Sequence, residues 1–179
     1  MPSGYPSLDR MLGGGFRRQD LVVLAGDVAS GKSALALGMA IRSAGAGVAT
    51  LFLSGEMSPD RVMERALALE SKVSVDDLRQ ARLDIEGRAA VGAAAVRLRD
   101  IPLVLRPLLG TGFEEVRSAL EIVPPRALLV VDSLQLTPPP RPAARLGQRI
   151  ALAVRALKGL AVELDLAVLA VAQLPGLKP

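Results

Sequence analysis

The chain has 179 residues and a formal net charge of +4; half of its residues are hydrophobic, but only 2% are aromatic. This length and apolar content predict one domain with a sizeable core rather than a disordered chain. The sequence has no cysteine, which excludes disulfides and thiolate metal sites, and no histidine, the usual general base and zinc ligand. Any chemistry must therefore rest on carboxylates, Lys, Arg, Ser and Gln, and the scarcity of aromatic rings disfavours base stacking as a main mode of nucleic-acid binding.

The sequence shows no sign of a second domain or of membrane insertion. No internal repeat and no break in composition divides it, so residues 1–179 are interpreted as a single domain. No basic-then-apolar leader is visible, and no apolar run is long enough to span a bilayer. We therefore expect a cytoplasmic location and no membrane partner, while the modest positive charge permits a polyanionic partner without requiring one.

The first 25 residues predict a short helix and a strand. Ser7 can cap a helix that carries Leu8 and Met11 on one face, and the glycines at 13–15 end it. Residues 21–25, Leu-Val-Val-Leu-Ala, form a continuous apolar run, which is typical of a buried parallel strand.

This strand leads into a loop with phosphate-binding spacing. Residues 26–33 read Gly-Asp-Val-Ala-Ser-Gly-Lys-Ser, the pattern G-x-x-x-x-G-K-[ST]. The two glycines let backbone N–H groups converge on phosphate oxygens, the lysine reaches the β- and γ-phosphates, and the serine hydroxyl ligates Mg²⁺. The helix that follows adds its positive N-terminal dipole. The phosphate-contacting residues predicted from this loop are Gly26, Ala29, Ser30, Gly31, Lys32, Ser33 and Ala34.

The remainder of the chain alternates between strands and helices. Apolar runs predict strands at 48–53, 102–105, 127–131 and 167–172. Helices are predicted over 58–69, after 74, over 84–99, over 111–120 and along a basic stretch that ends near 164. Val62, Ala66 and Leu69 are expected on the buried face of the first of these, and Thr111 with Glu114 has the spacing of a capping box. The alternation predicts an α/β fold with a mostly parallel sheet and helices on both faces.

One loop and three polar residues lie at the predicted carboxyl ends of strands, where sheets of this kind bind ligands. They are the loop at Gly26, Glu56, Asp132 and Gln173. Asp132 closes an apolar strand, as expected of a carboxylate that holds Mg²⁺ through water. Glu56 can orient and deprotonate an attacking water, and Gln173 can hydrogen-bond the terminal phosphate or that water. The alternatives are a turn residue for each carboxylate and a polar cap on a strand for Gln173.

Five motifs follow one another along the chain. They are Gly4-Tyr5-x-x-Leu8-Asp9 with the glycines at 13–15, the loop GDVASGKS, Leu53-Ser-Gly-Glu56-Met57-Ser58, Val131-Asp132-Ser-Leu-Gln135-Leu136 and Ala172-Gln173-Leu174. This combination spans nearly the whole chain and resembles the ATPase domain of DnaB-type replicative helicases, within the RecA-like ATPases. The resemblance implies a RecA-like P-loop fold, ATP hydrolysis with Mg²⁺, and a homo-hexameric ring that moves on single-stranded DNA.

The resemblance also assigns roles to individual residues. Lys32 and Ser33 match the phosphate-loop pair of the family, and Glu56 matches its catalytic glutamate. Asp132 matches the second Mg²⁺-associated carboxylate, and Gln173 matches the sensor glutamine. Lys32, Glu56 and Gln173 are thus the expected catalytic residues, and Ser33 and Asp132 the expected metal-associated ones.

The sequence also departs from the family pattern in several places. Val28, Ala29 and Ser30 stand where family members usually have a small residue in mid-loop, and the segment after Leu136 is rich in proline. No N-terminal collar is seen, and the chain ends at the fifth predicted strand, so the C-terminal strands with the family's arginine finger are expected to be missing. Two alternatives therefore stay open: a RadA- or KaiC-like ATPase without unwinding activity, and a non-hydrolysing ATP-binding interaction module.

A nucleic-acid contact is expected in the proline-rich loop and the helix after it. Arg141, Arg145 and Arg149 follow the strand that ends at Asp132, so they should lie near the ligand-bearing edge of the sheet. In the family the corresponding region faces the channel of the ring, where arginines contact DNA phosphates without reading sequence. The alternative is that these arginines only solvate a long helix.

Overall fold

A computed structural model describes residues 1–174 and contains a five-stranded sheet in the order β1-β5-β4-β2-β3. Every adjacent pair of strands runs parallel. The strands are β1 (Leu21–Gly26), β2 (Thr50–Ser54), β3 (Leu103–Pro107), β4 (Leu128–Asp132) and β5 (Ala167–Gln173). Each predicted strand is therefore present, with its bounds shifted by at most two residues, and the α/β class is confirmed.

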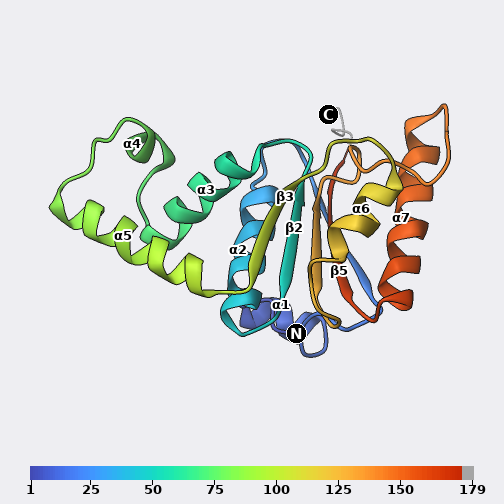
Figure 1. Cartoon of the computed structure of the whole chain (residues 1–179), viewed down its shortest axis with the longest axis horizontal. Helices are drawn as coiled ribbons and strands as arrows, with labels where there is room; N and C mark the ends of the chain where they lie inside the picture. The colour runs from blue at the N-terminus through green and yellow to red at the C-terminus, as the bar shows by residue number, and fades with distance from the viewer. Residues whose placement is uncertain (175–179) are drawn as a thin grey trace.

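Helices cover both faces of the sheet (Figure 1). One side carries α2 (Lys32–Gly45), α3 (Pro59–Ser71) and α5 (Ile85–Asp100), and the other carries α6 (Phe113–Leu120) and α7 (Leu146–Glu163). The short helices are α1 (Pro6–Met11) near the N-terminus and α4 (Val75–Arg79), which projects with one end of α5 away from the sheet. Within residues 1–174, no helix combines the length and the apolar character that a membrane span requires.

The two sides of the sheet form two separate cores because side chains alternate along each strand. Phe52, Val130 and Leu169 pack toward α2 and α3, whereas their neighbours Leu51 and Leu129 pack toward α6 and α7. In β2 and β4 every residue is buried, because these strands have a strand on each side and helices on both faces. The apolar runs of the sequence thus reflect strands buried on both faces.

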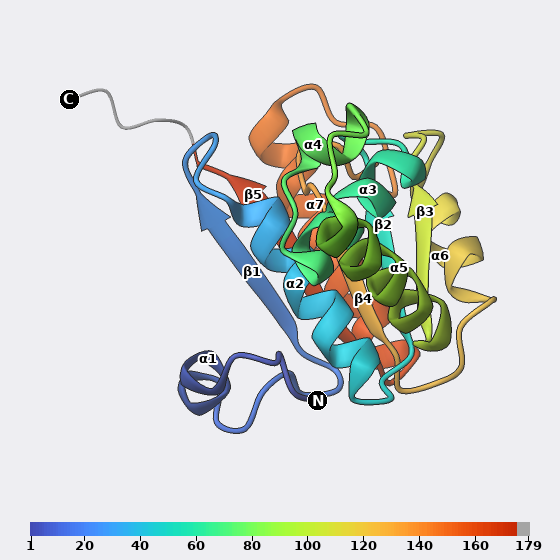
Figure 2. The same ribbon diagram turned by 90° about the vertical axis from the view of Figure 1, so that its left-hand side faces the viewer.

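The first strand differs from this pattern. We predicted a buried strand over 21–25, but β1 lies at an edge of the sheet, and Val23 is 45% exposed. Figure 2 shows β1 at the margin of the fold, beside α2 but with one long edge unpaired by any described strand. An edge strand has neighbours on one side only, so its apolar side chains are less well covered.

The buried face of α3 also differs from the prediction. Val62 and Ala66 are fully buried as expected, but Ala68 is buried instead of Leu69, which remains 43% exposed. The last turn of α3 lies where the chain leaves the sheet toward α4, so the helix buries less of its expected face there.

The predicted helix starts were correct for α3, α4 and α5 and wrong for α1 and α6. Ser58 is the N-cap of α3, as expected. Ser74 accepts a hydrogen bond from the Asp77 N–H at 3.0 Å, as a capping residue should. Ser7, however, lies inside α1, because Pro6 occupies the first helical turn and its fixed φ favours that position.

The other incorrect cap is at α6. Its N-cap is Gly112, and it is Glu115 rather than Glu114 that accepts a hydrogen bond from the Thr111 N–H, at 3.1 Å. The start of α5 is as predicted, because Asp84 accepts a hydrogen bond from the Gly87 N–H at 2.7 Å.

Candidate functional site

The register of the parallel strands brings distant polar residues to one edge of the sheet. Gly26 at the end of β1 pairs with Gln173 at the end of β5, and Ser54 at the end of β2 pairs with Asp132 at the end of β4. Parallel strands end at the same edge, so the segments that follow them start side by side. Glu56 follows β2 directly, and the Gly55 N–H donates to the Asp132 carbonyl at 2.6 Å.

The loop between β1 and α2 has the backbone geometry of a phosphate site. Gly31 is the N-cap of α2 with a positive φ of 84°, a conformation that favours glycine. A Cβ on Gly26, the first glycine of the motif, would lie 3.1 Å from the Ser30 hydroxyl oxygen. The loop can therefore turn this tightly because Gly26 has no side chain. The Lys32 ammonium donates to the Asp27 carbonyl and to Ser30 Oγ, which holds it over the loop. Backbone N–H groups at the start of an α-helix, together with its dipole, attract phosphate.

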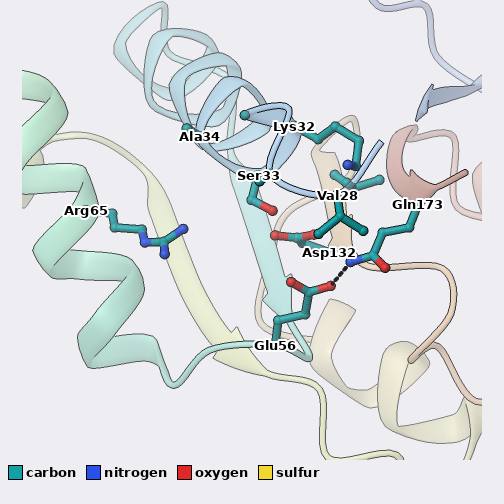
Figure 3. Close-up of a pocket in the computed structure, with 11 residues that line it drawn as sticks. Val28, Lys32, Ser33, Ala34, Glu56, Arg65, Asp132 and Gln173 are labelled. Atoms are coloured by element: carbon teal, nitrogen blue, oxygen red, sulfur yellow. Dashed lines mark hydrogen bonds between the residues drawn. The ribbon is translucent and has the colours of Figure 1, made fainter. Parts of the chain in front are cut away.

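The loop and the strand ends enclose a pocket of about 310 Å³. Figure 3 shows Lys32, Ser33, Glu56, Asp132 and Gln173 converging on it from α2, β4, β5 and the segment after β2. The predicted site residues that line it are Ala29, Gly31, Lys32, Ser33, Ala34, Glu56, Asp132 and Gln173. Gly26 and Ser30 belong to the loop but are not among the lining residues.

Glu56 is held by two hydrogen bonds to one of its oxygens. Gln173 Nε2 donates to Glu56 Oε1 at 3.2 Å, and Ser133 Oγ donates to the same oxygen at 3.3 Å. These bonds orient the carboxylate toward the pocket, and no described residue donates to Oε2. A carboxylate held in this way can accept a proton from a water molecule.

Asp132 is the most unusual group of the pocket, because it is completely buried and neither carboxylate oxygen receives a hydrogen bond from a described residue. Burial raises the pKa of Asp132 above its ordinary value; the nearby Ser33 hydroxyl opposes this rise, the Glu56 charge adds to it, and the charges of Arg65 and Lys32 oppose it. Mg²⁺ prefers oxygen ligands such as a carboxylate and a hydroxyl. Asp132 and Ser33 therefore have the chemistry of a Mg²⁺ site.

Three residues with contacts at this site were not given roles from the sequence. Arg65 on α3 lines the pocket, and Ser133 binds Glu56. The Gln135 amide donates to the Gln173 carbonyl at 2.8 Å, while its buried Oε1 has no partner among the described residues. Ser133 and Gln135 lie inside a motif that the sequence did single out. The signal for Arg65 was a charge directly before the buried Ala66, on the helix that follows Glu56.

The predicted DNA-contacting arginines lie outside this pocket. All three are exposed: Arg141 lines a separate groove of about 540 Å³ with Gln148 and Arg155, Arg145 is the N-cap of α7, and Arg149 lies in its first turn. The proline-rich loop and the start of α7 lie at the same end of the molecule as the carboxyl ends of the strands (Figure 1).

Comparison with known proteins identifies a family. A family model described as DnaB-like helicase C terminal domain matches residues 1–176. The replicative DNA helicase DnaB of Treponema pallidum is 32% identical over 175 residues, which are 96% of this chain and 40% of that protein. The DNA repair protein RadA of Mycolicibacterium smegmatis is 46% identical, but over only 65 residues, or 36% of this chain.

Solved structures point to the same family. A DnaB-like replicative helicase, solved in a study of its interactions with primase, superimposes with a TM-score of 0.86 at 26% identity, covering 97% of this chain and 43% of that one. This likeness confirms the predicted RecA-like fold. The chain spans less than two thirds of the length of both the Treponema helicase and this solved chain. Because the family model covers nearly all of its residues, the chain belongs to the family of DnaB-like helicase C-terminal domains.

Proposed function

We propose that the chain binds and hydrolyses Mg·ATP as the ATPase part of a DnaB-like replicative helicase acting on single-stranded DNA. The observation that carries this proposal is the convergence of the phosphate loop, Glu56, Asp132 and Gln173 on one pocket of about 310 Å³. The members of this set come from three strand ends and a helix start that are far apart in the sequence. Their convergence at the ligand-binding edge of a parallel sheet is what an ATPase of this fold requires.

In this proposal the phosphate loop binds the triphosphate. Backbone N–H groups from Ala29 through Ala34 surround the phosphates, and Lys32 pairs with the β- and γ-phosphates. Ser33 and Asp132 hold Mg²⁺, which when bound neutralises charge on the phosphate oxygens. The buried, unpartnered Asp132 supports this role, because a cation would supply the partner that its oxygens lack.

Glu56 acts as the base in this proposal. It accepts a proton from a water whose oxygen attacks the γ-phosphorus, the bond from that phosphorus to the β–γ bridging oxygen breaks, and ADP and phosphate leave. Gln173 and Ser133 position the carboxylate through their bonds to Oε1. Because the Gln173 amide lies beside both the pocket and Glu56, it is suited to respond to the terminal phosphate.

Single-stranded DNA binding is assigned in this proposal to Arg141, Arg145 and Arg149, and a homo-hexameric ring is the proposed assembly. A few phosphate contacts from one chain give weak and salt-dependent binding, and a ring multiplies them through effective concentration. The exposed position of all three arginines supports the proposed DNA binding.

The test is ATP turnover measured as phosphate release, with and without a single-stranded oligonucleotide, and with Lys32→Ala as the inactive control. Turnover that rises with DNA supports the helicase function. Turnover that is the same with and without DNA favours a RadA- or KaiC-like ATPase. Tight ATP binding without turnover favours an interaction module. Failure of the chain to bind Mg·ATP at all would refute the proposal.

A further inference from the structure

An open basin lies at the amino-terminal edge of the sheet, at the opposite end of the strands from the phosphate pocket. It has a volume of about 730 Å³, and its lining includes Arg17, Arg18, Gln19, Arg126 and Asp165. These residues lie in the segments that lead into β1, β4 and β5, which are neighbours in the sheet. Figure 1 shows the N-terminus at the same end of the molecule. We propose that this basic basin binds an acidic segment of a partner protein.

The basic basin has more positive than negative charge. Three of its lining residues are arginines, and Asp165 is its one carboxylate. Arg18 is already paired with Asp165. Arg126 makes no hydrogen bond or ion pair with any described residue, and Arg17 donates only to the Gly13 carbonyl among them, at 3.2 Å. Arg17 and Arg126 therefore keep donors available for a carboxylate of another molecule.

Asp165 shows which kind of anion these surroundings stabilise. Gln19 Nε2 donates to its carboxylate at 3.0 Å. This hydrogen bond, together with the charges of Arg18 and Arg126, outweighs desolvation and holds the pKa of Asp165 below its ordinary value. The charged form of a carboxylate is thus favoured in the basic basin. A second carboxylate, brought by a partner, would meet the two arginines that Asp165 leaves unpaired.

The spacing of these two arginines fits an extended chain with acidic residues at alternate positions. Because β5 lies between β1 and β4, the segments that carry Arg17 and Arg126 are two strand spacings apart, or about 10 Å. Side chains on one face of an extended peptide are about 7 Å apart, and two long arginine side chains can bridge the difference. A single phosphate ion would leave most of the basin empty. Single-stranded DNA is disfavoured because Phe16, the one aromatic lining residue, is only 2% exposed and offers bases no stacking surface.

The segments around the basic basin are held in place without a partner. The Gln19 N–H donates to the Leu166 carbonyl at 2.7 Å, and the Lys158 ammonium donates to the Gln19 carbonyl. Gln19, Arg126 and Asp165 have positive φ angles of 67°, 66° and 51°, in the region that favours glycine. Side chains in such backbone conformations are often found at functional sites. A surface that is already ordered loses little conformational freedom when it binds.

The test is fluorescence anisotropy of a labelled peptide, Glu-Ser-Glu-Ser-Glu-Ser, titrated with the full chain at low salt. The uncharged peptide Gln-Ser-Gln-Ser-Gln-Ser should bind at least about tenfold more weakly. Arg17→Ala combined with Arg126→Gly should weaken binding of the acidic peptide by about tenfold, because it removes both proposed contacts. Glycine relieves the positive φ of residue 126, so weaker binding at an unchanged Tm identifies a lost contact rather than a damaged fold.

Asp165→Asn tests the charge balance in the opposite direction. It frees Arg18 and removes a competing carboxylate, while asparagine still tolerates the left-handed backbone, so the acidic peptide should bind about threefold more tightly. Glu86→Gln makes the same change of net charge on α5 and should not tighten binding. Arg82→Ala with Arg88→Ala removes two exposed arginines outside the basic basin and should not weaken it.

Competition separates the classes of anion. Neither inorganic phosphate nor an unlabelled single-stranded oligonucleotide, added at constant ionic strength, should displace the acidic peptide. Displacement by phosphate would make the basic basin a phosphate site, and displacement by the oligonucleotide a general polyanion site; either result overturns the proposal. Equal peptide affinity of the parent and the basin double variant, or equal weakening by the control pair, also overturns it. Lys32→Ala should bind the peptide like the parent, so the result does not depend on the proposed ATP binding.

Discussion

Replacing Asp132 by asparagine should stabilise the free chain and reduce the stabilisation that Mg·ATP provides. In the free chain, the Asp132 carboxylate is fully buried and no described residue donates to it, so its charge opposes folding at neutral pH. Asparagine has nearly the same shape without the charge. Removing one unsatisfied buried charge while leaving a neutral amide should stabilise the free chain by about 1–2 kcal/mol. For a chain of this length, this corresponds to a rise in Tm of about 2–4 °C per kcal/mol.

The pH dependence of this effect follows from the direction of the pKa shift. Burial raises the pKa of Asp132, so the folded chain binds a proton more readily than the unfolded chain. Below the unfolded pKa, near 4, both states are protonated and the carboxyl carries no penalty. As the pH rises through the unfolded and then the folded pKa, the parent loses stability. The stability advantage of Asp132→Asn over the parent should therefore be smallest near pH 4 and grow as the pH rises.

Mg·ATP should narrow or reverse the difference in stability between the parent and the variant. At a ligand concentration of 100 times Kd, binding stabilises the parent by about 2.7 kcal/mol. Asp132→Asn lacks the charged group proposed to hold Mg²⁺, and should gain less than about 1 kcal/mol at the same concentration. Thermal unfolding with and without Mg·ATP, at pH 7 and at lower pH, measures both effects. As a control, Asp100→Asn removes an exposed carboxylate that is paired with Arg99. It should have little effect on the stability of the free chain or on the stabilisation by Mg·ATP. A variant that is less stable than the parent without ligand, or that gains as much from Mg·ATP, would refute the reasoning.

Four other variants test the proposed roles. Lys32→Ala should weaken Mg·ATP binding by about 10- to 100-fold in a titration, because a charge-assisted contact is lost; unchanged affinity contradicts the proposed contact. Glu56→Gln should lower kcat by a factor of about 10² to 10⁴ with little change in Kd or Tm. The amide oxygen can still accept the two hydrogen bonds, but the amide cannot act as a base. Turnover at the parent rate would mean that another group is the base. Gln135→Ala should lower kcat by about tenfold without changing ATP affinity, because it removes the bond that fixes the Gln173 carbonyl. Arg141→Ala with Arg145→Ala should reduce weak, salt-dependent binding of a labelled oligonucleotide in fluorescence anisotropy.

Matched controls separate these roles from general destabilisation. Gln80→Ala changes an exposed glutamine at the end of α4 and should leave kcat unchanged, unlike Gln135→Ala. Arg88→Ala on α5 removes a positive charge far from the proline-rich loop and should leave DNA binding intact. If Arg88→Ala reduces DNA binding as much as the double variant does, net charge rather than the loop accounts for the binding.

The sequence by itself determined the class of the fold, the phosphate loop and the family. These properties are local or follow from chain order. The loop is one contiguous stretch with fixed spacing, and strands buried on both faces leave apolar runs that are readable without knowing their neighbours. Polar residues that end such runs, as Asp132 and Gln173 do, could be assigned to the ligand-bearing edge before the strand order was known.

Only the tertiary structure decided how these pieces meet. The order β1-β5-β4-β2-β3 sets β1 beside the last strand, which makes β1 an edge strand and brings Gly26 opposite Gln173. Strand order and register depend on packing between segments that are distant in sequence, and local periodicity carries no information about them. The same packing leaves the carboxylate oxygens of Asp132 without a hydrogen-bond partner within residues 1–174 and places Arg65 between two pockets, because burial and contact belong to the assembled layers rather than to any one segment.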